Sequence, residues 1–212
     1  MSMNKMEVKI KSSKLKSPNK IAKVKDNAVR NFRSAVENNQ KYGEAYLNLG
    51  NALKVINQNI EAIESYKKAL ELDCDDNEVW LKQGNVANKV RRYDQALECY
   101  DKALSLKPDY AEAWSNKAIT LNDLKRYEEA LIAYDKALEI KPDVEFLLGT
   151  RLHLQMQIAN WDGLENGLTI LEQKLENGHH AAPPFPLLSL IENPQLQQRA
   201  AEAWIQAKAP PN

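Results

Sequence analysis

Hydrophobic residues in the middle of the chain recur with the period of an amphipathic helix. Residues 111–144 contain two apolar stripes with i, i+4, i+7 spacing, which places each stripe on one helical face. The stripes are Trp114, Ala118 and Leu121, then Ala130, Tyr134 and Ala137. A polar break separates them at Lys125-Arg126, and Pro142 ends the second helix. The pattern predicts a pair of helices, and no segment of the sequence shows the sustained alternation of a strand.

This helix pair recurs along the sequence at intervals of 34 residues. The units are 43–76, 77–110 and 111–144, and the last two are identical at 15 of 34 positions. Counted within a unit, all three share an aromatic residue at position 4, glycine or alanine at position 8, alanine at positions 20 and 27, and tyrosine at position 24. A fixed period of this length indicates a repeat protein in which neighbouring helix pairs stack.

These shared positions resemble the tetratricopeptide repeat family over residues 43–144. The resemblance implies an all-α fold, a right-handed α-solenoid of antiparallel helix pairs whose first helices line a concave groove. The units depart from the family pattern at position 7, where Gln83 and Lys117 replace an apolar residue, and at Cys74, where proline is usual. We expect these departures to loosen the packing locally without changing the fold.

The segment upstream of the repeats predicts a single capping helix. Residues 24–42 contain apolar residues that match only the second helix of a repeat, namely Ala28, Phe32 and Ala35. Residues 1–23 are rich in lysine and contain Pro18, so we expect a basic, disordered arm there.

The segments downstream of the repeats predict further helices. Residues 145–178 keep the length of a helix pair but lose the motif, so we expect a divergent capping pair. Residues 179–212 predict a proline-rich loop, extended over 181–186, and a terminal helix. Asn193 precedes a proline and is the expected N-cap of that last helix.

Part of this downstream region has a resemblance of its own. The motifs are Asn160-Trp161-Asp162, then Pro183-Pro184-Phe185-Pro186-Leu187-Leu188-Ser189-Leu190, then Pro194-Gln195-Leu196-Gln197. They look like the segment that joins the repeats to the catalytic domain in bacterial O-linked N-acetylglucosamine transferase (SPINDLY-type) proteins. The resemblance implies a substrate-recruiting role beside a nucleotide-sugar domain, which this sequence does not contain.

The charge distribution is asymmetric, although the 29 basic and 29 acidic residues cancel. Residues 1–33 carry a net charge of +8, so the remainder carries −8. A basic arm can attract nucleic acid or an anionic membrane. No aromatic residue interleaves the lysines of the arm to stack on bases, so we favour a solvated tail.

The composition predicts a soluble, cytoplasmic protein. The two cysteines, Cys74 and Cys99, lack CxxC spacing and fit a reducing compartment. The apolar runs are far shorter than the roughly 18 residues of a membrane span. No apolar segment typical of a secretory signal follows the first lysines.

No catalytic constellation can be built from the sequence. It contains three histidines and neither a GxGxxG nor a GxxxxGK[ST] phosphate loop. The adjacent His179 and His180 lack a cysteine or carboxylate cluster that would complete a metal site. We therefore predict a protein that is not an enzyme and has no cofactor, metal or small-molecule substrate.

Asparagines on the first helices are the strongest candidates for binding. Asparagine is about 0.6 kcal/mol worse than alanine in a helix, and the second helices of the same repeats carry none in their interiors. The six residues are Asn48, Asn51, Asn85, Asn88, Asn116 and Asn122. Helical geometry predicts that they point away from the partner helix, where carboxamides could pair with the backbone of an extended peptide. In the O-linked N-acetylglucosamine transferase family, a row of asparagines on this surface holds substrate backbones.

The row is interrupted by Lys82 and Ile119. Lys82 and Lys89 complete the predicted groove. A clamp of basic residues around a terminal carboxylate is a less favoured alternative, because Glu112 and Asn116 stand where such a clamp uses basic residues. The asparagines could also be tolerated surface residues without a ligand.

We therefore predict a protein- or peptide-binding scaffold. The alternative from the enzyme class is the recruiting portion, or a catalytically incomplete relative, of a protein O-glycosyltransferase. A third hypothesis is an assembly module that oligomerises through its C-terminal helices, for which the apolar segment 146–158 and Trp204 are the sequence basis.

Overall fold

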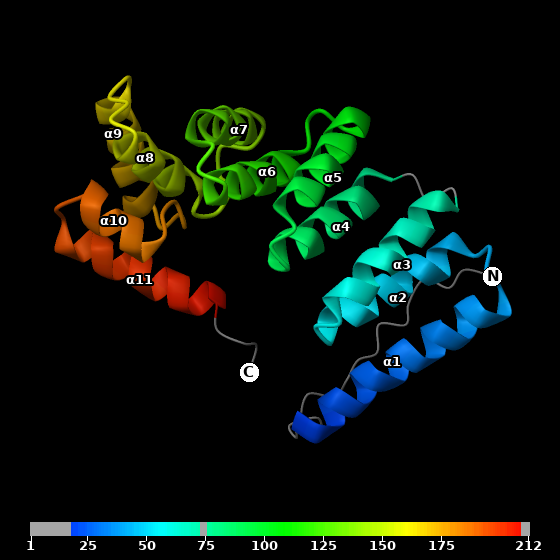
Figure 1. Cartoon of the computed structure of the whole chain (residues 1–212). Coiled ribbons are helices and arrows are strands. Elements are labelled where there is room, and N and C mark those ends of the chain that lie inside the picture. The colour runs from blue at the N-terminus through cyan, green and yellow to red at the C-terminus, as the bar shows by residue number, and fades with distance from the viewer. Residues whose placement is uncertain (1–17, 73–75, 209–212) are drawn as a thin grey trace. The chain divides into compact units, whose positions relative to one another are not determined.

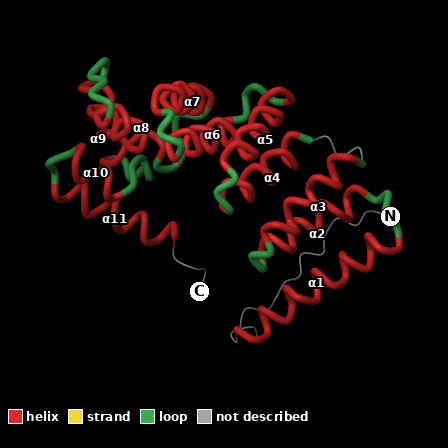
Figure 2. The backbone as a smooth tube through the Cα atoms, in the orientation of Figure 1, coloured by secondary structure: helices red, strands yellow, loops and turns green. Residues whose placement is uncertain are grey.

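The computed structural model describes residues 18–72 and 76–208, and within them it contains eleven α-helices and no strand (Figures 1 and 2). The all-α repeat fold expected from the sequence is therefore confirmed. The chain divides into two compact units, one up to Val90 and one from Arg91, and each is described by itself.

The first unit contains four helices, and its central pair is the first repeat. The helices are α1 (Pro18–Asn38), α2 (Gly43–Val55), α3 (Asn59–Glu71) and α4 (Asn77–Lys89). α2 and α3 pack against each other most extensively, and α1 covers α2 as extensively as α3 covers α4. Arg33 of α1 forms an ion pair with Glu61 of α3 at 2.6 Å, which ties α1 to the repeat.

The second unit contains seven helices. They are α5 (Tyr93–Leu106), α6 (Ala111–Asp123), α7 (Tyr127–Ile140), α8 (Leu147–Gln157), α9 (Leu164–Glu176), α10 (Pro184–Leu190) and α11 (Pro194–Lys208). α6 and α7 form the third repeat, and α5 packs on α6 as the second helix of the repeat before it. α8 contacts α7, α9 and α10, which explains why its sequence is apolar on more than one side.

The residues shared between repeats form the core of each helix pair. The alanines at positions 20 and 27 and the tyrosine at position 24 are fully buried in all three repeats. In the first repeat, Gly50 lets the ring of Tyr66 approach the α2 backbone, since a Cβ at Gly50 would lie 2.7 Å from Cε1 of that ring. The close approach explains why position 8 holds only glycine or alanine.

Every helix pair from the first repeat to α8–α9 turns through a left-handed residue. Position 15 has a φ between 54° and 62° in each, at Asn57, Arg91, Lys125 and Ala159. The following residue closes the turn in three of them by donating its backbone N–H to the carbonyl oxygen five residues earlier. These bonds join Gln58 to Leu53 (3.0 Å), Arg126 to Leu121 (2.9 Å) and Asn160 to Gln155 (3.0 Å).

The departures at position 7 have a structural explanation in the second unit. Lys117 of α6 pairs with Asp101 of α5 at 2.5 Å, and Arg151 of α8 pairs with Asp135 of α7 at 2.9 Å. Both bonds join position 7 of one helix pair to position 25 of the pair before it. A basic residue at position 7 therefore links neighbouring repeats rather than loosening them.

Two helix boundaries differ from the prediction. α1 begins at Pro18, inside the range expected to be a disordered arm, and ends at Asn38. α10 begins at Pro184, inside the segment expected to be extended. The physical reason is the same for both, because the first turn of a helix needs no backbone N–H and tolerates proline. The rest of the predicted arm and Cys74 lie outside the described residues.

The predicted N-cap of the last helix is confirmed. The side-chain oxygen of Asn193 accepts hydrogen bonds from the backbone N–H groups of Gln195 (3.1 Å) and Leu196 (3.3 Å) at the start of α11. Gly178 follows α9 with a φ of 80° and donates its N–H to the Leu175 carbonyl at 3.0 Å, as expected of a glycine that ends a helix.

Candidate functional site

The six candidate asparagines are all half-buried on first helices. Those in the first unit are Asn48 and Asn51 on α2 and Asn85 and Asn88 on α4; those in the second unit are Asn116 and Asn122 on α6. The two sets belong to separate units, so each is considered within its own unit.

Asn51 does not point away from its partner helix, contrary to the expectation from helical geometry. Its carboxamide oxygen accepts a hydrogen bond from the hydroxyl of Tyr66 on α3 at 2.9 Å. The reason is the neighbouring Gly50: because that residue has no side chain, the long tyrosine ring crosses α2 there and its hydroxyl emerges beside Asn51. Asn51 therefore has a structural role that the periodicity could not reveal.

The same ring in the third repeat lacks this partner. Position 9 is Ile119 instead of asparagine, and the hydroxyl of the fully buried Tyr134 has no hydrogen-bond partner within the described residues. Burial raises the pKa of Tyr66 to about 12, and burial also raises the pKa values of Tyr100 and Tyr134. These hydroxyls stay protonated at neutral pH, and that of Tyr66 donates its proton in the hydrogen bond to Asn51.

Three of the asparagines have carboxamides that the fold does not use. Asn48, Asn88 and Asn122 are half-buried, and their side chains make no hydrogen bond to any described residue. The two candidate lysines differ from them. Lys82 pairs with Glu78 one turn earlier on α4, and Lys89 donates to the side-chain oxygen of Asn57 at 2.7 Å.

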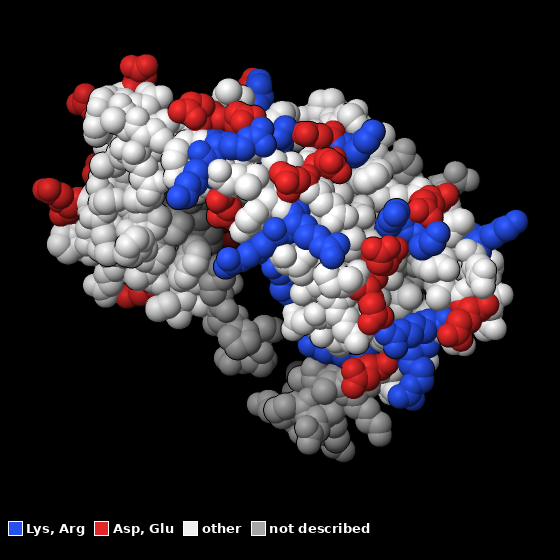
Figure 3. All heavy atoms as spheres, in the orientation of Figure 1, with Lys and Arg blue, Asp and Glu red and all other residues white. Residues whose placement is uncertain are grey.

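The charge on the face shown in Figure 3 gives no second candidate site. Figure 3 shows basic and acidic side chains intermixed on the visible face of both units. Neither sign of charge dominates a large area of this face, so a ligand recognised there would have to be held by polar and apolar contacts as well as by charge.

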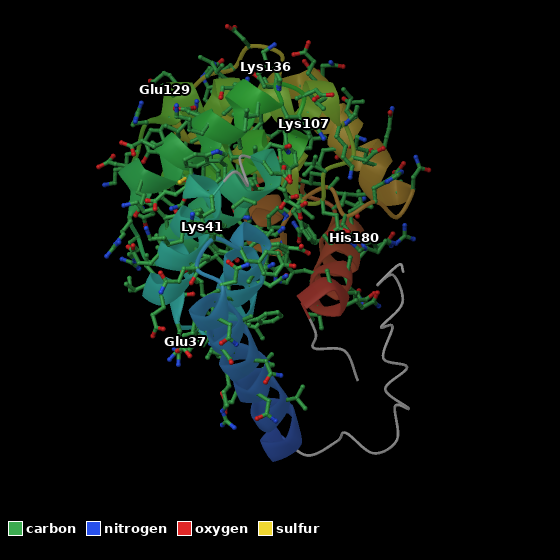
Figure 4. The ribbon with its side chains drawn as sticks, turned by 90° about the vertical axis from the view of Figure 1, so that its right-hand side faces the viewer. Glu37, Lys41, Lys107, Glu129, Lys136 and His180 are labelled. Carbon is green, nitrogen blue, oxygen red and sulfur yellow. The ribbon has the colours of Figure 1, made fainter. Side chains whose placement is uncertain are left out.

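The histidine pair belongs to an aromatic cluster at the start of α8. His180 stacks on Phe146 with ring centroids 5.7 Å apart, and Trp204 of α11 meets Phe146 edge-on at 4.7 Å; Figure 4 shows His180 beside α11. His180 also approaches Glu145, with 3.6 Å between Nδ1 and Oε1. A cavity of about 240 Å³ adjoins both histidines, but no group of three metal-ligating side chains occurs in the described part of the chain.

The buried cysteine has a packing role. Cys99 lies in α5 beside Tyr100, and burial raises the pKa of its thiol to about 12, which leaves it protonated and unreactive at neutral pH. No helix in residues 18–72 or 76–208 has the length and hydropathy needed to cross a bilayer.

Comparison with known proteins identifies the repeats. Residues 43–76 and residues 81–145 each match a sequence family described as the tetratricopeptide repeat. No curated protein sequence matches the chain. The resemblance of the downstream segment to glycosyltransferase linkers gains no support from these comparisons.

The fold is similar to several solved structures. The crystal structure of MamA gives a TM-score of 0.69 at 22% identity, over 75% of this chain and 94% of that chain. YrrB, a TPR protein with an unusual peptide-binding site, gives a TM-score of 0.62 at 18% identity, over 86% of each chain. The first TPR of Spaghetti (RPAP3), bound to the HSP90 peptide SRMEEVD, gives 0.53 at 20% identity, over 55% of this chain and 93% of that chain. Together these findings support a tetratricopeptide-repeat protein whose repeats lie within residues 43–145.

Proposed function

We propose that the chain is a non-catalytic scaffold that binds an extended segment of a partner protein along α2 and α4, the first helices of its first unit. The observation that carries the proposal is the pair of half-buried carboxamides on Asn48 and Asn88, which the fold leaves without hydrogen bonds to described residues. A carboxamide that is partly withdrawn from water gains most from a ligand that both donates and accepts, and a peptide backbone does both.

The first unit supplies the more complete surface. It carries Asn48 and Asn51 on α2 and Asn85 and Asn88 on α4. Because the oxygen of Asn51 accepts from Tyr66, that side chain offers its N–H groups to a ligand carbonyl while the tyrosine holds its orientation. A fixed amide loses less conformational entropy on binding than a free one.

The structural relatives support this mode of binding. YrrB is described as having a peptide-binding site, and the first TPR of Spaghetti was solved with an HSP90 peptide. Those ligands belong to those proteins; the proposal for this chain rests on its own amides and requires a backbone-directed, sequence-tolerant mode of recognition.

The test removes amides that have no structural role. The Asn48→Ala/Asn88→Ala variant should retain its helicity, because alanine is about 0.6 kcal/mol better than asparagine in a helix. Its affinity for peptides selected from an array of 15-residue sequences should fall about thirtyfold, since two hydrogen bonds of about 1 kcal/mol each are lost. Fluorescence anisotropy would measure the dissociation constants.

The matched control is Asn166→Ala, which removes an exposed asparagine from α9, a helix outside the predicted groove. It should bind the selected peptides as the natural chain does. Equal affinities for the double variant and the natural chain would contradict the proposal, and so would an equal loss in the control.

A further inference from the structure

α1 has the packing of a second helix without the first helix of its pair. Its Val29 and Val36 are buried on the side that packs against α2, as α3 packs against α4. The residues at positions 20, 24 and 27 of this incomplete repeat are Ala28, Phe32 and Ala35. They are only half-buried, whereas the equivalent residues of all three complete repeats are fully buried. Val24, on the same side of α1 and 56% exposed, extends this face.

The chain does not supply the missing helix through the usual turn. Residue 25 of α1 is equivalent to Asn59, where α3 begins after its turn. α1 nevertheless begins at Pro18 and continues as a helix through the place of that turn. The face formed by Val24, Ala28, Phe32 and Ala35, called here the open face of α1, therefore has no first helix packed on it among the described residues.

The complete repeats show what fits such a face. In the first repeat, α2 presents Tyr46, Gly50 and Leu53 at positions 4, 8 and 11, and the small residue lies against the Tyr66 ring. Phe32 takes the place of that ring in α1. The occupant must therefore carry glycine or alanine opposite Phe32, with an aromatic residue four positions before it and an aliphatic residue three positions after it.

The charge of the chain near α1 indicates the sign of the charge that an occupant should carry. Residues 1–33 carry a net charge of +8, and Lys25 borders the open face. At 100° per residue, Asp26 and Glu37 lie about 160–180° from the open face, and Arg30 and Arg33 lie about 145–155° from it, so Lys25 is the charged residue of 24–38 that borders the face. Glu37 is labelled near the C-terminal end of α1 in Figure 4. A basic or neutral helix gains nothing from Lys25 or from the net positive charge of residues 1–33 in the sequence, whereas an acidic helix is attracted by both.

We propose that the open face of α1 is the docking site of an acidic amphipathic helix from a partner protein, which completes the incomplete repeat. The docked helix takes the position of a first helix and covers Ala28, Phe32 and Ala35. The basic residues at the start of the chain raise the rate of encounter and select against basic partners. This site is separate from the amides of the proposed groove.

The probe is a labelled 16-residue peptide that carries the tyrosine, glycine and leucine of residues 43–55 at the same spacing and glutamate at its outward positions. It should bind the full chain saturably in a fluorescence anisotropy titration. Leucine in place of the peptide's glycine should weaken binding at least tenfold, because the ring of Phe32 leaves no room. Lysine in place of the glutamates should weaken it by a similar factor. The proposal would be overturned if the leucine peptide or the lysine peptide bound as tightly as the original peptide, or if the original peptide showed no saturable binding.

Variants of the chain locate the site. Ala28→Glu should weaken binding of the acidic peptide at least tenfold while circular dichroism shows unchanged helicity, and the matched control Ala201→Glu on α11 should bind normally. If Ala28→Glu alters the fold, Lys25→Glu gives the same test, with a loss that shrinks as salt is added. The Asn48→Ala/Asn88→Ala variant should bind this helical peptide normally, which separates this site from the groove.

Competing occupants give distinct outcomes in the same set of variants. The chain could bind vesicles of phosphatidylcholine and phosphatidylserine, or duplex DNA, and fail to bind the peptide. If Ala28→Glu abolished that binding, the open face would be a site for a membrane or for DNA, and the proposal would be wrong. A mass in solution that rises with concentration, and that Ala28→Glu returns to the monomer, would show a second copy on the open face and would also contradict the proposal.

Discussion

The first and third repeats place the same buried tyrosine in two different settings. Tyr66 and Tyr134 are both fully buried between the helices of their pair. The hydroxyl of Tyr66 donates to Asn51, whereas that of Tyr134 has no partner among the described residues, and the residue equivalent to Asn51 in its repeat is Ile119. The difference shows that an asparagine at position 9 serves the fold, so the asparagines at positions 6 and 12 are the better indicators of binding.

The two regions also differ in how neighbouring helix pairs are joined. In the second unit, positions 7 and 25 form ion pairs at Lys117–Asp101 and Arg151–Asp135. In the first unit the equivalent residues are Gln83 and Lys67, which cannot form an ion pair with each other. The ion pair between positions 7 and 25 is therefore a feature of the second unit, and the first unit joins its repeats by other contacts, such as the hydrogen bond from Lys89 to Asn57.

Removing each hydroxyl should have opposite effects on stability. Tyr66→Phe should lower the free energy of unfolding by about 1 kcal/mol, because it removes a hydrogen bond. Tyr134→Phe should raise it by about 1 kcal/mol, because it removes a buried donor that has no partner. Urea unfolding followed by circular dichroism measures both. Effects of the same sign would mean that Tyr134 has a hydrogen-bond partner in solution, and the comparison would fail.

Converting the third repeat into the first should stabilise it. Ile119→Asn places a carboxamide beside Tyr134, and the new hydrogen bond should add up to about 1 kcal/mol to the free energy of unfolding. Asparagine and isoleucine have similar helix propensities, so the backbone contributes little to the change.

A double-mutant cycle supplies the control for this exchange. In a Tyr134→Phe background the gain from Ile119→Asn should vanish, because the hydroxyl is no longer present. A gain of the same size in both backgrounds would show that the stabilisation does not come from the hydrogen bond.

Breaking the ion pairs of the second unit should have the smallest effect. Asp101→Asn and Asp135→Asn should each lower the free energy of unfolding by about 0.5 kcal/mol at low salt, because the carboxylates are more than half exposed and well screened. The loss should disappear in 1 M salt. Lys67→Gln in the first unit, where no such pair exists, should be neutral under both conditions; a loss there would contradict the distinction between the units.

The sequence alone was sufficient to predict the helix pairs, because their order follows from a strict 34-residue period. The tyrosine at position 24, the small residue at position 8 and the alanines are buried as expected, whereas the aromatic residue at position 4 is half-buried in all three repeats. The prolines were misinterpreted: Pro18 and Pro184 begin helices, because the constraint that proline places on a helix interior does not apply to the first turn.

The candidate site was less predictable, for a physical reason. Periodicity gives the direction in which a side chain leaves its own helix and says nothing of the length of a side chain that arrives from another. Asn51 was expected to point away from its partner helix, yet the hydroxyl of Tyr66 on that helix reaches past Gly50 and donates to it. The ion pairs at position 7 escaped prediction similarly, since they depend on a residue in the preceding repeat.

The left-handed residue at position 15 limits how this chain can change in length. An inserted residue in the three-residue turn would rotate the second helix by about 100° about its axis and carry its tyrosine away from the glycine or alanine that receives it. A deletion would rotate it equally in the other sense. Duplication or deletion of a whole 34-residue block leaves the contacts within each remaining helix pair unchanged. Such proteins can therefore change in length by whole repeats while each helix pair keeps its geometry.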